Sequence, residues 1–117
     1  MGTASATIHA GICGFTTRVR AEADEAYQAS LTVESDCEKV QAYGSDLATK
    51  MPLSAFDELR LGSDGAILAI ARKHLKGCCA ACVTCDGVFK AMQVAAGLAL
   101  PAPVDIELAL IEGSSAK

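Results

Sequence analysis

Cysteine is the residue type whose number and spacing in this chain could support chemistry. Six of the 117 residues are cysteines, about 5% of the chain, which exceeds ordinary usage without reaching the density of a disulfide scaffold. Cys13 precedes a glycine, Cys37 lies between two acidic residues, and four more cysteines lie between positions 78 and 85. Thiolates in such numbers bind metal ions or clusters, or they exchange electrons with other thiols.

The last group of cysteines has the spacing of a chelating loop. Two residues separate Cys79 from Cys82, and two more separate Cys82 from Cys85. This spacing lets one loop bring two sulfurs to the same ion. We therefore expect Cys79, Cys82 and Cys85 to be candidate metal ligands.

Cys13 and Cys37 lie where the predicted backbone leaves amide groups free. The pair Cys13-Gly14 interrupts a strand pattern, and a glycine in such a pattern marks a bulge or a close backbone approach. Ser35 is followed three residues later by Glu38, which predicts a capping box and places Cys37 in the first turn of a helix. Free amides and the helix dipole favour a thiolate at such positions.

The elements that must position these thiols begin with two strands. Apolar and polar side chains alternate over residues 6 to 22, interrupted at Cys13, and the alternation resumes over residues 26 to 34. A period of two residues is typical of a half-buried strand, and the short turn between the two segments predicts a hairpin.

Helices and one more strand are predicted in the remainder of the chain. Apolar residues at helical spacing predict helices from Cys37 to Pro52, over 54–59, over 64–75, and from position 83 or 86 to about 98. Two prolines then break the pattern, and residues 104–110 alternate as a last strand.

This order of elements predicts one domain over residues 1–117 with an α+β fold. We expect a small antiparallel sheet, made of the N-terminal hairpin and the C-terminal strand, packed on one side against about four helices. In that topology Cys13, Cys37 and Cys82 lie at one end of the sheet. They would be three convergent ligands, with Cys79 or Cys85 as the fourth.

Composition argues against several classes of function. The net charge of −4 provides no basic surface for phosphates, so we expect no nucleic-acid partner. The N-terminus does not resemble a signal peptide, and no stretch approaches the ~18 apolar residues that a membrane span requires. These features predict a cytoplasmic protein without a membrane partner. Cytoplasmic thiols are kept reduced, and this favours metal or redox chemistry over disulfides.

Other residues of possible chemical interest have simpler interpretations. Cysteine is also a small buried hydrophobe, so Cys13 and Cys37 could serve packing in an alanine-rich core. His9 and His74 are expected to be structural or solvent-facing, and Lys90 is expected to be a solvated charge. No arrangement typical of a hydrolase is present in the sequence.

From Cys13 onward the pattern resembles the scaffold proteins of iron-sulfur cluster assembly, the IscU and NifU N-terminal family. The matching features are Cys13 before a glycine, Cys37 after the second strand, and Cys82 at the head of a late helix that carries Lys90. The resemblance implies an IscU/NifU-N-like fold in which these three cysteines hold a nascent cluster or a zinc ion. Phe15 is found where the scaffolds have an aspartate.

Three classes of function remain. The first is a non-enzymatic protein that binds zinc or an iron-sulfur cluster, with a protein partner in metal or sulfur delivery. The second is a thiol redox or sulfur-transfer protein in which Cys82 is the nucleophile and Cys79 or Cys85 resolves it. The third is a small structural or partner-binding domain. Thiolates bind zinc and iron-sulfur clusters alike, so the sequence leaves the metal and the oligomeric state open.

Overall fold

The described chain contains an antiparallel sheet of four strands in the order β1-β2-β3-β4. The structure is a computed structural model, and it describes residues 2–113. β4 is short and pairs with only two residues of β3, Gln28 and Ala29. The strands are β1 (Thr3–His9), β2 (Thr16–Ala23), β3 (Gln28–Ser35) and β4 (Leu53–Ser54).

Helices form most of the described chain after β3. The expected helices over 54–59 and 64–75 correspond to α2 and α3, and the fourth begins at Thr84. Two short 3-10 helices, η1 and η2, precede α3 and α4. The bounds are α1 (Glu38–Ala48), α2 (Ala55–Leu61), η1 (Gly62–Asp64), α3 (Ala66–His74), η2 (Gly77–Cys79) and α4 (Thr84–Ala95).

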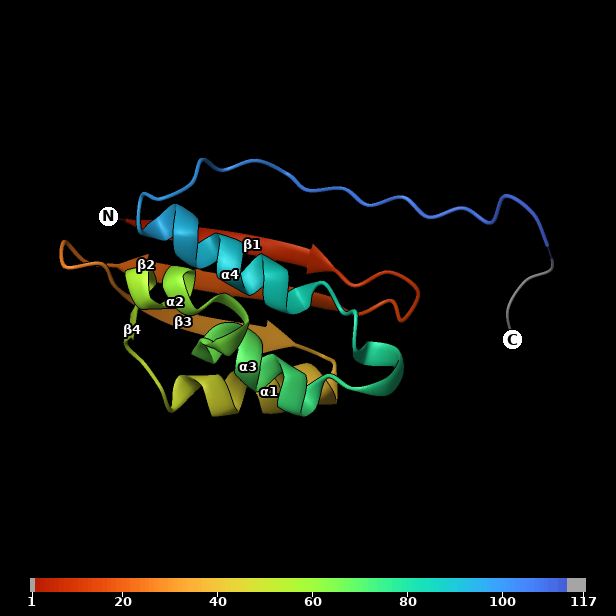
Figure 1. Ribbon diagram of the computed structural model, residues 1–117, viewed down its shortest axis with the longest axis horizontal. Coiled ribbons are helices and arrows are strands. Elements are labelled where there is room, and N and C mark those ends of the chain that lie inside the picture. Colours follow the sequence, from red (N-terminus) through yellow and green to blue (C-terminus); the bar gives the residue numbers. More distant parts are fainter. Residues whose placement is uncertain (1, 114–117) are drawn as a thin grey trace.

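The helices cover one face of the sheet and leave the other face open (Figure 1). Val19 and Ala21 of β2 are buried beneath the helices, whereas the alternate residue Arg20 is exposed. Such alternation is expected of a sheet with one face against a core. The α+β fold predicted from the sequence, a small antiparallel sheet packed against helices, is confirmed.

Buried polar groups join the helices to one another. Tyr43 of α1 is fully buried, and its hydroxyl donates to the carbonyl oxygen of Ile67 in α3 at 2.9 Å. Glu58 of α2 is buried as well, and its carboxylate accepts from the N–H groups of Ala66 and Ile67 at 3.1 and 2.8 Å. These bonds satisfy amide donors that the start of α3 would otherwise leave unpaired.

The helix α4 runs antiparallel to β1. The N–H of Gly2 donates to the carbonyl of Ala95 at 2.8 Å, so the end of α4 lies beside the start of β1. Toward the other end, a Cβ atom on Gly87 would lie 2.5 Å from Cδ1 of Ile8, which shows how closely the Ile8 side chain packs against the backbone of α4. The N-terminus of α4 therefore lies at the end of the sheet where β1 finishes.

Residues 6–22 do not form one interrupted strand. β1 ends at His9, a loop of residues 10–15 reverses the chain, and β2 begins at Thr16. Gly11 and Gly14 have φ angles of 96° and 76°, and the N–H of Gly14 donates to the carbonyl of Gly11 at 2.9 Å. Glycine adopts such angles without strain, so the expected bulge is a complete reversal. The strand expected over 26–34 is β3, which forms a second hairpin with β2.

The start of α1 is also built differently from the expected capping box. Cys37 is the N-cap residue and makes no side-chain capping bond. Ser35 Oγ instead accepts from the N–H of Cys37 at 3.1 Å and from the hydroxyl of Thr17 at 3.0 Å. Cys37 thus precedes the first turn of α1, and Ser35 ties the corner to β2.

The expected strand over residues 104–110 does not join the sheet. This segment is extended and unpaired, and it runs in the direction of β1 and beyond the body of the molecule (Figure 1). Its apolar side chains are exposed, including Val104 at 63%, Ile106 at 67% and Leu108 at 91%. The prediction that a C-terminal strand joins the sheet is therefore wrong. An alternating pattern indicates an extended segment, but it does not indicate which strand that segment pairs with.

One stretch meets the length and hydropathy of a membrane span. Residues Gly77–Ala95 have a mean hydropathy of 1.2, which corrects the expectation that no stretch of this kind occurs. In the structure the stretch is divided between η2 and α4, and Val88 and Met92 of α4 are fully buried in the core. The high hydropathy of this stretch therefore comes in part from residues of α4 that pack on the sheet.

Candidate thiol site

Three cysteine-bearing segments lie at the same end of the sheet, which we call the cysteine end. They are the loop 10–15, the corner 36–37 between β3 and α1, and the segment 75–83 before α4. The register pairs His9 with Thr16 and Thr17 with Ser35, so the end of β1, the start of β2 and the end of β3 lie side by side. Figure 1 shows the segment 75–83 at this end too.

Cys13 is the most accessible of the predicted ligands. It is exposed in the loop 10–15, which is closed by a hydrogen bond from the N–H of Ala10 to the carbonyl of Phe15 at 3.1 Å. Phe15 and Ile12 beside it are exposed as well. The loop therefore presents the thiol of Cys13 to solvent.

Cys37 is held more firmly than Cys13. It is half-buried and packs against the hydrophobic core. Its N–H donates to Ser35 Oγ, and its carbonyl accepts from the N–H of Gln41 at 2.9 Å. The backbone of Cys37 is thus fixed at the corner where β3 becomes α1.

Cys79, Cys82 and Cys85 are linked by local hydrogen bonds at the entrance to α4. The N–H of Cys82 donates to the carbonyl of Cys79 at 3.0 Å, and Sγ of Cys85 donates to the carbonyl of Cys82 at 3.7 Å. Sγ of Cys82 donates to Oγ1 of the buried Thr84 at 3.2 Å. These bonds fold the segment that carries the three cysteines into consecutive turns at the entrance to α4.

Lys39 connects the two cysteine-bearing regions of the helical layer. Its Nζ donates to Sγ of Cys79 at 3.6 Å, which joins the first turn of α1 to η2. Sequence reasoning missed this residue. Its position in the sequence could have indicated the contact. Lys39 follows Cys37 by two residues, so it lies in the first turn of a helix that begins at the cysteine end.

The thiols of Cys79 and Cys85 are harder to ionise than an ordinary cysteine. Burial and the neighbouring Cys78 raise the pKa of Cys79, while the ammonium of Lys39 opposes that rise. Burial, followed by the charges of Asp86 and Cys82, raises the pKa of Cys85. Cys85 lies in the first turn of α4, so the expected activation by the helix N-terminus is overcome by desolvation at this position.

The predicted ligands share one end of the molecule but are not gathered around one point. Within residues 2–113, no group of three or more cysteine, histidine or acidic side chains is close enough to hold a metal ion. All six cysteines are free thiols. Cys79, Cys82 and Cys85 lie on one segment at the entrance to α4, Cys37 lies at the start of α1, and Cys13 is on the separate loop.

The remaining residues singled out from the sequence have ordinary environments. His9 is exposed and its Nδ1 shares a hydrogen bond with Thr16 Oγ1 at 3.2 Å. His74 is half-buried, and its Nε2 lies 3.0 Å from Oδ2 of Asp46. Lys90 is exposed on α4. The expected structural or solvated roles of these residues agree with these positions.

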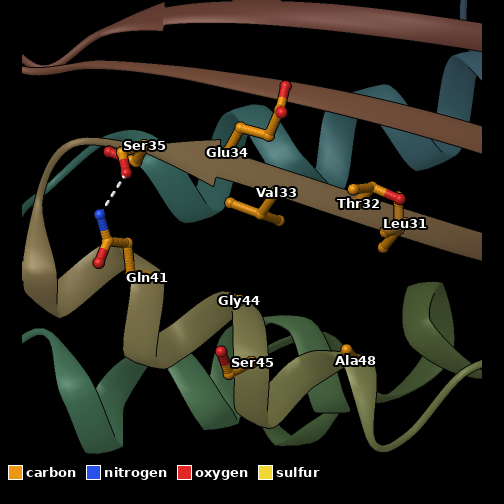
Figure 2. Close-up of a pocket in the computed structure, with 9 residues that line it drawn as sticks. All are labelled: Leu31, Thr32, Val33, Glu34, Ser35, Gln41, Gly44, Ser45 and Ala48. Carbon is orange, nitrogen blue, oxygen red and sulfur yellow. Dashed lines mark hydrogen bonds between the residues drawn. The ribbon is translucent and has the colours of Figure 1, made fainter.

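A surface groove lies beside the corner at Cys37, because Ser35 and Gln41, which line it, hydrogen-bond to the backbone of Cys37. It has a volume of about 470 Å³ and runs between β3 and α1 (Figure 2). Gln41 bounds it by donating from Nε2 to the carbonyl of Ser35 at 2.7 Å, and a Cβ atom on Gly44 would lie 3.1 Å from Cβ of Val33. The groove is lined by Leu31, Thr32, Val33, Glu34, Ser35, Gln41, Gly44, Ser45 and Ala48. Neither cysteine nor histidine lines it, so the thiols remain the candidate site for chemistry.

Comparison with known proteins places the chain in a family. No curated protein and no solved structure matches it significantly. A family model described as a family of unknown function, DUF6951, matches residues 4–108, which include all six cysteines. The match covers most of the chain, and the protein therefore belongs to this family of unknown function.

Proposed function

We propose that this protein binds a zinc ion or an iron-sulfur cluster through Cys13, Cys37 and Cys82, with Cys79 or Cys85 as the fourth ligand. The observation that carries the proposal is the common location of the three cysteine-bearing segments at the cysteine end. Ligands from three separate segments are typical of a site that a fold positions, whereas cysteines used only for packing need not share one end.

The chemistry of the donors fits such a group. Thiolates are the preferred protein ligands of zinc and of iron-sulfur clusters. Cys37 and Cys82 are half-buried, and Lys39 beside Cys79 supplies a positive charge that offsets the charge of several thiolates. Within residues 2–113 no three of these thiols are close enough to share one ion, so binding requires the loop 10–15 and the segment 75–83 to bring their cysteines together. Two glycines with positive φ give the loop 10–15 a sharply turned backbone.

The proposed role is that of a carrier or scaffold rather than an enzyme. The resemblance to cluster-assembly scaffolds supports this role, because the three cysteines occupy the same order of elements. The exposure of Cys13 also supports it, since a bound ion or cluster would remain accessible to a protein partner in metal or sulfur delivery. We place this exchange in the reducing cytoplasm, where free thiols persist.

The first test is purification of the protein under anaerobic, chelator-free conditions. An absorption spectrum and a total metal analysis of the same sample distinguish zinc from an iron-sulfur cluster. We expect about one ion or one cluster per chain. A protein that contains neither, and that takes up neither when supplied with zinc or with iron and sulfide, contradicts the proposal.

The second test is replacement of individual ligands by serine. Cys37→Ser and Cys82→Ser each remove one thiolate with little change in packing, so metal affinity should fall by about tenfold or more. Cys78→Ser is the matched control, because Cys78 is exposed and adjacent to Cys79. Circular dichroism should show the same fold for all three variants. Retention of metal by Cys37→Ser and Cys82→Ser would refute the assignment of ligands.

A second candidate function is thiol redox or sulfur transfer. The observation that favours it is that Cys79, Cys82 and Cys85 are free thiols on one segment at the entrance to α4. In this function Cys82 would attack and a neighbouring thiol would resolve the mixed disulfide. Titration against glutathione redox buffers, followed by peptide mapping, should then detect a Cys82 disulfide in the metal-free protein.

A further inference from the structure

The C-terminal segment of the described chain has the pattern of a strand that lacks a partner. Val104, Ile106 and Leu108 alternate with Asp105 and Glu107, so an extended backbone directs the apolar and the acidic side chains to opposite sides. All residues from 100 to 113 are exposed. The family match extends to residue 108, so it includes most of this segment. An extended apolar segment of this length is typically covered when the protein is assembled.

The sheet has a free edge of matching length. β1 is seven residues long and pairs with β2 on one side, and no strand within residues 2–113 pairs with its other side. An unpaired edge presents N–H and C=O groups that can bond to an added strand. On the helix side, Ala4 and Ala6 of β1 are only half-buried, so apolar side chains beside them would complete the cover.

The charges on the open face are complementary to the segment. With Val104, Ile106 and Leu108 turned toward the helices, Asp105 and Glu107 lie on the open face. Arg18 and Arg20 of β2 are exposed on that face, opposite Thr7 and Ser5 of β1. Arg18 also lies opposite Glu34 of β3, and Arg20 lies 3.8 Å from Glu22, so an added strand would share these arginines with two carboxylates of the sheet. An added strand would lie two strand spacings from β2, about 9.6 Å, a gap that an arginine and a carboxylate side chain can span together. The free edge of β3 beyond β4 is less suitable, because Glu34 faces the same open side there.

We propose that residues 104–110 of one copy add as a strand to the β1 edge of a second copy, and that the exchange is reciprocal. Pro101 and Pro103 stiffen the connection and direct the segment away from its own body. Within one chain the segment runs beyond the body of the molecule and does not pair with its own β1, although it begins at that edge (Figure 1). Reciprocal exchange closes a symmetric dimer. This proposal is independent of the thiol site.

The test measures the mass of the full-length protein in solution, with reductant and chelator present so that neither disulfides nor metal ions join the copies. Sedimentation velocity should give a dimer of the 12.0 kDa chain. Ile106→Asp combined with Leu108→Asp should give a twofold fall in mass. Ala109→Asp is the control, since it adds a negative charge to the opposite side of the segment and should leave the dimer intact.

A charge exchange identifies the surface that the segment contacts. One chain carries Arg18→Glu and Arg20→Glu, and a second carries Asp105→Lys and Glu107→Lys. Either variant alone places like charges on the segment and on the surface that it contacts, so each should be monomeric. An equimolar mixture of the two variants should restore the dimer. A monomeric wild type, with the amides of 104–110 either freely exchanging or protected within their own chain, overturns the proposal. So does a dimer that is unaffected by the paired substitutions at 106 and 108.

Discussion

At the scale of single residues, the six cysteines show how strongly position controls one functional group. Cys85 lies at a helix N-terminus, where a thiolate is electrostatically favoured, yet burial and nearby negative charge raise its pKa. Cys79 has a raised pKa as well, but Lys39 opposes the rise. A cationic neighbour is thus the feature that distinguishes the setting of Cys79 from that of Cys85.

Lys39 should therefore control the reactivity of Cys79. In Lys39→Met, loss of the ammonium removes the favourable interaction with the thiolate, so the pKa of Cys79 rises further and alkylation near pH 8 slows. The rate at Cys85 should not change, because Lys39 does not contribute to its pKa. Timed alkylation with peptide mapping measures both sites. Lys50→Met, two residues beyond the end of α1, is the control, and an equal slowing by both variants would contradict the assigned role of Lys39.

A cluster of three charged or polar side chains, Asp46, Lys73 and His74, joins α1 to α3. Oδ2 of Asp46 lies 3.0 Å from Nε2 of His74 and accepts from Nζ of Lys73 at 3.1 Å. These hydrogen bonds, with that of His74 the larger, lower the pKa of Asp46 below its ordinary value of 3.8. The folded state therefore favours the ionised carboxylate. Its contribution to stability is complete above the ordinary pKa and is lost as pH falls through the lowered value.

Asp46→Asn should accordingly destabilise the protein in a pH-dependent way. The variant should lower the free energy of unfolding near neutral pH, and the difference from wild type should shrink as the pH falls below 3.8. Urea titrations across this range measure the difference. Asp64→Asn is the control, because Asp64 is 83% exposed and lies 3.9 Å from Arg72. A difference that stays constant down to the lowest pH would show that Asp46 acts through packing alone.

At the scale of elements, the helices were predictable because their apolar periods are clear. Val40, Tyr43 and Leu47 of α1 are buried as their spacing predicts. The loop 10–15 was not predictable in this way, because alternation on its two sides does not distinguish a bulge from a reversal. The segment 104–110 shows the converse error. Its alternation correctly predicts an extended backbone, but the partner of a strand is set by long-range contacts that no local pattern contains.

The candidate site also has some features that the sequence predicts and others that it does not. The common end of Cys13, Cys37 and Cys82 follows from the order of elements, which the sequence reveals. The contact between Lys39 and Cys79 joins residues 40 positions apart, and the raised pKa of Cys85 depends on burial. Both of these depend on how α1, η2 and α4 pack against each other, so composition and spacing could not predict them.

The packing of α4 on β1 sets the position of the thiols at its entrance, and Gly87 controls that packing. Gly87→Ala should cost about 1–3 kcal/mol in unfolding free energy, because the new methyl group collides with the side chain of Ile8. In an Ile8→Ala background the colliding atoms are gone, so the same change should cost less. A double-mutant cycle from chemical denaturation measures the coupling. Equal costs in both backgrounds would show that α4 can move away from β1 freely.

At the scale of the whole molecule, the chain consists of a packed body and an extended C-terminal segment. The body contains the sheet, the helices and the complete buried core, whose last member is Ala96. Residues 100–113 are all exposed within their own chain. The stability of the body should therefore not depend on this segment, whereas association between copies should depend on it.

Truncation after Ala99 separates these two contributions. The shortened chain should keep the circular dichroism of the full chain, since it retains every buried core residue. Its Tm should be independent of protein concentration, while the Tm of the full chain should rise with concentration, because association stabilises the folded state by mass action. Thermal unfolding over a 100-fold range of concentration measures both. A full chain with the same concentration-independent Tm as the truncated one would show that the segment makes no contact between copies, and loss of folding on truncation would show that it supports its own body.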